Sequence, residues 1–247
     1  MRKKTIFHYE FRRLVCSRDY LLLLVAVLAY CGFLLRGSVI YGTSFTAPFS
    51  PWTFCDYLSS VMVLLLALLL ALCARQFTVS ERGAMAIIDA APMPVSVFRA
   101  IRYAAIACAF LIVAALSFGM CFVFYWLVFD YTAFGTLIQT GLTLLLPSAL
   151  LIFGAAMLLG NKKPVLVYIL LAAVLVVGVF GISLPACIDV IGRSVIQPLY
   201  GGVYDFAFSL SFIAGRIVFV IAGIACIILS LRLPHKRKTP CPKHLVK

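Results

Sequence analysis

The chain contains apolar runs that approach the length of a membrane-spanning helix. The clearest is VMVLLLALLLALCA, which ends at Ala74. A helix needs roughly 20 residues, at about 1.5 Å each, to cross a hydrocarbon layer about 30 Å thick. Six windows come near this length, and we expect spans at about 20–35, 54–74, 103–129, 136–160, 165–184 and 212–231.

Composition agrees with a chain whose main solvent is lipid. Of the 247 residues, 64% are hydrophobic and only 12% are charged, whereas a water-soluble domain carries about a quarter charged residues. The predicted fold class is therefore all-α, a polytopic membrane protein with about six transmembrane helices. Residues 185–211 contain too many turn-forming residues for one straight span.

Lysine and arginine lie in short blocks between the apolar runs. With six spans and a cytoplasmic N-terminus, eighteen of them lie inside and three outside, namely Arg36, Arg193 and Arg216. The positive-inside rule then places both termini in the cytoplasm. No basic stripe alternates with exposed aromatics, so the net charge of +13 favours an anionic lipid leaflet over nucleic acid as partner. Arg36 and Arg216 lie near span ends, where snorkelling explains them.

The segment before the first span has an amphipathic pattern. Phe7, Phe11 and Leu14 recur at helical spacing and form its apolar side. The polar side is expected to hold Glu10, Arg12 and Arg13. This pattern predicts a helix lying in the membrane interface, with its arginines near anionic headgroups. An ordinary basic flank of a span is the alternative.

The segment 75–102, between the second and third spans, has helical periodicity of its own. Its apolar positions would share one face, and they are Ala84, Ile87, Ile88 and Ala91. Ser80 is a candidate N-cap, and Pro92 and Pro94 would stop the helix. A short helix held between two spans is expected either to transmit movement to the spans or to bind a partner protein. A passive surface helix is the alternative.

In these features the chain resembles the ABC transporter type-2 permeases, the membrane subunits of ATP-driven exporters. Members have an amphipathic N-terminal helix, six spans and a coupling segment after the second span. Here Glu81-Arg82-Gly83, the helix ending at Pro92, and Pro94-Val95-Ser96 look similar to that segment, and Arg102 stands near the family's lysine. The residues that the resemblance assigns to ATPase contact are Glu81, Arg82, Gly83, Ile87, Ile88, Asp89, Pro92 and Pro94.

The resemblance also implies the partners. Two permease copies, identical or related, would pair with two cytoplasmic ABC ATPase subunits in a bacterial plasma membrane. ATP and Mg²⁺ would bind the ATPases, whose closure would push on the coupling helices. Compact family members include efflux or immunity proteins for antibiotic and bacteriocin peptides, so antimicrobial peptides or other amphipathic molecules are the expected cargo class here.

Motifs for chemistry within the chain itself were not found. No P-loop, HExxH or GxSxG string occurs, so no catalytic, cofactor or metal residues are predicted and the chain is not expected to be an enzyme. The nine cysteines form no CxxC pair and are expected to be free thiols. Asp56, Gln139 and Ser148 are the main polar residues in or near the spans, and structural roles are expected for them.

The expected organisation is an amphipathic helix at 1–18, a six-helix domain at 19–234 and a basic cytoplasmic tail at 235–247. Two other functions remain open. The chain is a non-transporting assembly or sensory protein if the 75–102 helix docks a different partner. It is an intramembrane enzyme of unfamiliar type if the isolated chain has activity.

Overall fold

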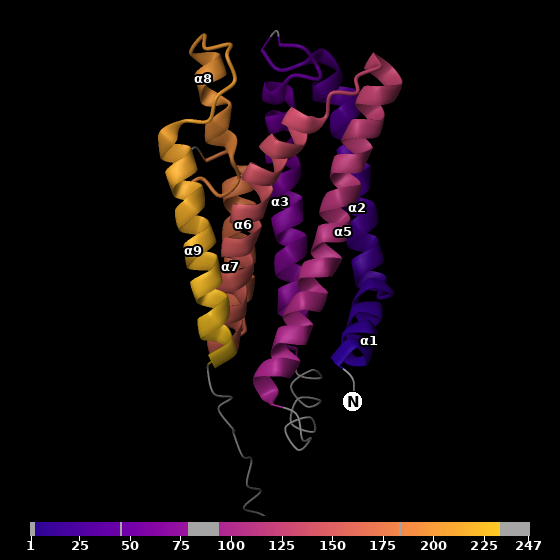
Figure 1. The fold of residues 1–247 in the computed structure, drawn as a ribbon, viewed down its shortest axis with the longest axis vertical. Coiled ribbons are helices and arrows are strands. Elements are labelled where there is room, and N and C mark those ends of the chain that lie inside the picture. Colours follow the sequence, from indigo (N-terminus) through magenta and orange to yellow (C-terminus); the bar gives the residue numbers. More distant parts are fainter. Residues whose placement is uncertain (1–2, 45, 79–93, 183, 233–247) are drawn as a thin grey trace, which may run out of the picture.

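The computed structural model describes residues 3–44, 46–78, 94–182 and 184–232. Eight α-helices contain most of these residues, and no β-strand occurs among them (Figure 1). The helices are α1 (Lys3–Val15), α2 (Arg18–Leu34), α3 (Pro51–Arg75), α5 (Val95–Phe129), α6 (Gly135–Lys162), α7 (Val165–Val179), α8 (Gln197–Tyr200) and α9 (Leu210–Arg232). A π-helical turn (Leu35–Val39) continues α2, and a 3₁₀ turn (Arg193–Val195) precedes α8.

Among the described residues, five helices are long and apolar enough to cross a membrane: α2 with its π-helical turn, α3, α5, α6 and α9. Each of them contains one of the windows predicted from hydropathy. The protein is therefore a multi-pass helical membrane protein by helix length and hydropathy.

The predicted span at 165–184 is wrong in length, because the helix found there is shorter. The helix α7 has 15 residues and covers about 22 Å, less than the hydrocarbon layer. It ends where Gly181 takes a φ of 65° and the amide of Ile182 donates to the carbonyl of Val177. This is the usual way in which a glycine stops a helix. The described part of the chain therefore has five long candidate spans and one short apolar helix.

The helix α3 is the central element of the bundle. It packs against α2, α5, α6 and α7, and most of its side chains are buried. In Figure 1, α1 and α2 lie to its right and α6, α7 and α9 to its left, while α5 crosses obliquely toward the lower middle. The helices α6 and α9 approach closely where Gly223 faces the backbone of Leu150. A Cβ atom at position 223 would lie only 2.7 Å from the carbonyl oxygen of Leu150, so the lack of a side chain permits this approach.

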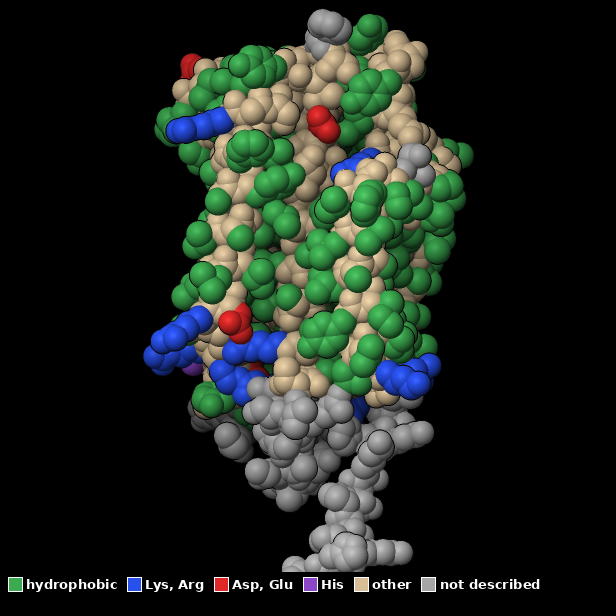
Figure 2. All heavy atoms as spheres, turned by 180° about the vertical axis from the view of Figure 1, so that it is seen from behind, with side chains coloured by type: hydrophobic (Ala, Val, Ile, Leu, Met, Phe, Trp, Pro, Cys, Tyr) green, Lys and Arg blue, Asp and Glu red, His purple; other side chains and the backbone are tan. Residues whose placement is uncertain are grey.

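One end of the bundle carries most of the positive charge. The helix α1, the end of α3, the start of α5 and the last described turn of α9 all lie at the lower end in Figure 1. We call it the basic end, and it holds Lys3, Lys4, Arg12, Arg13, Arg18, Arg75, Arg99, Arg102, Lys162, Lys163 and Arg232. On the face seen in Figure 2, Lys and Arg side chains gather near this end, below a broad apolar belt. Its assignment to the cytoplasm stays a prediction.

The segment between α7 and α9 folds back against the bundle, which confirms that residues 185–211 are not one straight span. Ile191 in this segment is buried. The carboxylate of Asp189 accepts hydrogen bonds from three backbone amides just after it, which fixes the local turn. Arg193 reaches back to α7 and donates from Nη2 to the carbonyl of Gly178 at 2.6 Å.

Candidate functional site at the basic end

The connection between α1 and α2 is an elbow, residues 14–20, held by Ser17. Ser17 is the N-cap of α2, with extended backbone angles of φ −78° and ψ 144°, and its Oγ accepts a hydrogen bond from the amide of Tyr20 at 3.4 Å. The same hydroxyl donates to the carbonyl of Leu14 at 2.7 Å. Serine is a favoured N-cap because its hydroxyl satisfies an amide that the helix leaves free. The elbow therefore fixes the end of α1 relative to the start of α2.

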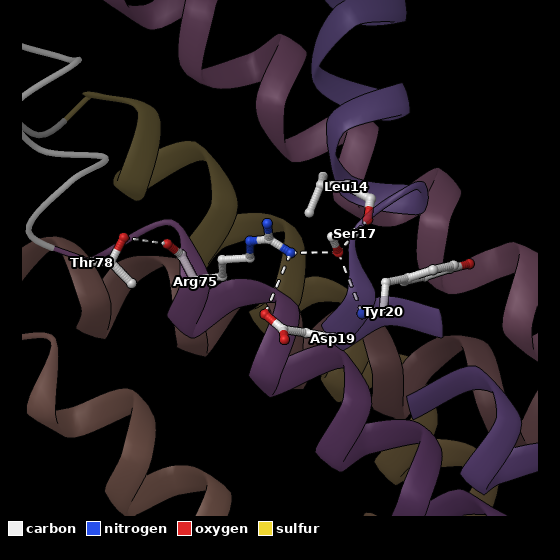
Figure 3. A network of polar contacts seen from close by, with 6 residues as sticks. All are labelled: Leu14, Ser17, Asp19, Tyr20, Arg75 and Thr78. Atoms are coloured by element: carbon white, nitrogen blue, oxygen red, sulfur yellow. Dashed lines mark hydrogen bonds and ion pairs between the residues drawn. The ribbon is translucent and has the colours of Figure 1, made fainter. Parts of the chain in front are cut away.

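Arg75 ties the end of α3 to this elbow (Figure 3). Its Nη1 donates to Ser17 Oγ at 2.5 Å and lies 3.9 Å from Oδ2 of Asp19. The side chain of Asp19 is 81% exposed, so solvent screens that ion pair and the hydrogen bond to Ser17 is the stronger link. The carbonyl of Arg75 also accepts from the hydroxyl of Thr78 at 3.1 Å.

Glu10 ties α1 to the start of α5. Its Oε2 lies 3.1 Å from Nη2 of Arg13 and 3.4 Å from Nε of Arg102. The side chains of Glu10 and Arg102 are both nearly buried, at 8% and 4% exposure. Opposite charges removed from water together offset the cost that each would have alone. This contact holds α1 beside the first turns of α5.

The buried side of α1 differs from the predicted one. Ile6, Glu10 and Leu14 are buried, so the placement of Glu10 on the polar side is wrong. The three residues follow one another at intervals of four, which is one face of a helix. The physical reason is that α1 packs on α5, where Arg102 supplies the charge that makes a buried carboxylate tolerable.

The residues predicted for the interfacial helix have different surroundings. Phe7 and Phe11 are half-buried against the core, with their rings stacked at 5.9 Å. Leu14 is buried, Arg12 is exposed, and Arg13 faces Glu10. The predicted helix exists, but it is covered in part by protein, and its contact with lipid stays a prediction.

A second polar cluster holds the first turns of α5 to α6 and α9. The hydroxyl of Tyr103 in α5 lies 2.7 Å from Oγ of Ser230 in α9. Asn161 at the end of α6 donates from Nδ2 to the same Oγ at 2.7 Å. Arg102 and Tyr103 are neighbours in sequence, so α5 is held to α1 on one side and to α6 and α9 on the other.

A small recess opens between α1, α3 and α5. It is lined by Glu10, Arg13, Leu14, Arg75, Gln76 and Arg102. The recess and the two polar clusters together lie where α3 ends and α5 begins. Sequence reasoning did not single out Ser17, Arg75, Tyr103, Asn161 or Ser230, because their partners are distant in sequence.

Most of the predicted ATPase-contact residues lie outside the described part of the chain. They are Glu81, Arg82, Gly83, Ile87, Ile88, Asp89 and Pro92. Pro94 is described and is the N-cap residue of α5, with extended backbone angles of φ −62° and ψ 129°. The structure thus describes both stems of the predicted coupling segment, the end of α3 and the start of α5.

Arg216 was expected to snorkel toward the membrane surface, and this is wrong. Its side chain is buried and donates from Nη1 to Oγ of Ser148, half-way along α6. The signal was in the sequence, because Phe212, Arg216, Phe219 and Gly223 fall at helical spacing on one face of α9. That face packs on α6, so Arg216 points inward.

Among the described residues, no group of three histidine, cysteine or acidic side chains could hold a metal ion. The eight described cysteines are free thiols.

Comparison of the chain with protein-family models, with curated proteins and with solved structures finds no match. These comparisons identify no family, and the likeness to type-2 permeases stays a prediction from the sequence.

Proposed function

We propose that this chain is the membrane-spanning permease subunit of an ATP-driven exporter. The observation that supports this best is the way both stems of the 75–102 segment are fixed. Arg75 holds the end of α3 to the elbow, and Arg102 holds the start of α5 to α1. A partner that moves this segment would therefore move packed helices instead of a loose loop.

The proposed coupling has two branches. A push on the 79–93 segment reaches α1 and α2 through Arg75 and Ser17. It also reaches α6 and α9 through the base of α5, where Tyr103 meets Asn161 and Ser230. Helices connected by such polar contacts can shift as rigid bodies, which is how domain motions open and close a path.

ATP and Mg²⁺ belong to a cytoplasmic ATPase partner in this proposal, and a second permease copy completes the path. In this proposal the chain itself supplies the membrane spans and the coupling segment 75–102. The apolar spans fit an amphipathic cargo such as an antimicrobial peptide, since few charged side chains line them.

The test is the double variant Glu81→Ala with Arg82→Ala in the native host. We expect normal insertion in the membrane, weaker co-purification of a P-loop ATPase, and reduced cargo export. The matched control is Arg36→Ala with Asp205→Ala, which removes the same two charge types from exposed positions away from the basic end.

Unchanged export and unchanged ATPase association in the Glu81/Arg82 variant would contradict the coupling role. Co-purification of a sensor or scaffold protein, with no ATPase, would favour the assembly or sensory function instead.

A further inference from the structure

Arg216 is a charged residue inside the span α9. Its side chain is 4% exposed. Its guanidinium carbon lies 4.3 Å from the ring centre of Phe212 and 5.3 Å from that of Phe219. A charge within a span is costly unless other groups compensate it, so the contacts of Arg216 need explanation.

The contacts in the described part of the chain leave the guanidinium incompletely satisfied. Nη1 donates to Oγ of Ser148, whereas Nη2 is buried and has no hydrogen-bond partner there. An unpaired buried donor costs free energy that a hydrogen-bond acceptor would recover. Ring contacts stabilise the positive charge, but they do not accept the Nη2 protons in the plane of the guanidinium.

The nearby carboxylate does not fill this gap. Asp189 contributes a favourable charge interaction with Arg216. Its oxygens, however, accept from the amides of Ile191 (3.0 Å), Gly192 (2.8 Å) and Ser194 (2.6 Å). The carboxylate is used to fold its own turn, and Arg216 forms no ion pair among the described residues.

An aromatic ladder leads from the start of α3 to the guanidinium. Trp52 meets Phe206 with ring centres 4.9 Å apart, Phe206 meets Phe208 at 5.2 Å, and Phe208 meets Phe212 at 5.3 Å. Phe206 and Phe208 are half-buried and their neighbours in sequence are exposed. The ladder therefore joins an accessible segment, opposite the basic end, to the buried charge.

We propose that Arg216 binds the carboxylate of an amphipathic molecule whose apolar part lies against the aromatic ladder and α9. The planar guanidinium matches the two oxygens of a carboxylate. A carboxylate adds one negative charge beside the guanidinium, whereas a doubly charged phosphate would add two in apolar surroundings. Binding needs no ATPase partner, so the site can exist whether or not the chain is a permease.

The experiment uses the purified full chain in phosphatidylcholine nanodiscs. The probes are a photoactivatable twelve-carbon fatty acid and the matching twelve-carbon alcohol, which has a neutral hydroxyl in place of the carboxylate. We expect the acid to reach half-maximal labelling at an about tenfold lower concentration, as one charge-assisted hydrogen bond predicts. Labelled peptides should map to α6 and α9 around Ser148, Phe212 and Phe219, and to the aromatic ladder at Trp52, Phe206 and Phe208.

The deciding variant is Arg216→Gln, in which the acid should lose its advantage over the alcohol. Arg36→Gln is the matched control, because Arg36 is exposed and the same charge is removed, and it should keep the advantage. If Arg216→Gln does not fold, the labelling map of the unaltered chain decides. Equal labelling by acid and alcohol, labelling only outside the aromatic ladder, α6 and α9, or an unchanged preference in Arg216→Gln would overturn the proposal.

Discussion

Glu10 and Arg216 are charged residues on the buried faces of their helices, and each marks a place where two helices are joined. Glu10 meets Arg102 across α1 and α5, and Arg216 meets Ser148 across α9 and α6. Both faces could have been read from helical spacing. The partners could not, because hydropathy does not report which helix packs against which.

The contribution of Glu10 can be measured with Glu10→Gln. This change removes the negative charge that faces Arg13 and Arg102 while keeping the side-chain size. We expect a loss of about 1.5–3 kcal/mol in stability, the range for hydrogen bonds to charged groups, seen as a lower thermal midpoint in detergent. The control Asp19→Asn changes a side chain that is 81% exposed and should alter stability by less than about 0.5 kcal/mol. Equal midpoints for the two variants would contradict the role given to Glu10.

At the scale of the elements, the long spans were predictable and the short helix was not. Windows of about 20 apolar residues define α3, α6 and α9 within a few residues, since lipid demands that length, whereas α5 begins eight residues before its window, at Val95. The end of α7 depends on the positive φ of Gly181, which hydropathy does not contain. The clusters at the basic end depend on contacts between distant residues, such as Arg75 with Ser17.

The end of α7 also depends on Arg193, whose Nη2 caps the carbonyl of Gly178 at 2.6 Å. In Arg193→Ala this carbonyl loses a charged donor, so the last turn of α7 should open more often. We expect amide hydrogen exchange to rise about tenfold or more in residues 176–182, with exchange in α6 unchanged, as measured by mass spectrometry. The exposed Arg36→Ala serves as control. Unchanged protection of 176–182 would mean that packing alone ends the helix.

For the whole molecule, the uneven distribution of charge is the feature that decides orientation. Eleven described lysine and arginine residues lie at the basic end, and three, Arg36, Arg193 and Arg216, lie away from it. The positive-inside rule predicts that the basic end faces the cytoplasm. This orientation is also what a cytoplasmic ATPase would need to reach the stems at Arg75 and Pro94.

Orientation can be tested with single cysteines in a background from which the nine native cysteines have been replaced. Lys163→Cys lies at the basic end and Asp205→Cys in the segment before α9, and both positions are exposed. A membrane-impermeant thiol reagent should label Asp205→Cys in intact cells and should label Lys163→Cys only after permeabilisation, because the positive-inside rule predicts that the basic end lies inside. Labelling after permeabilisation controls for access to both sites. The reverse pattern in intact cells would place the two stems outside, out of reach of any nucleotide-driven partner, and the proposed coupling would fail with it.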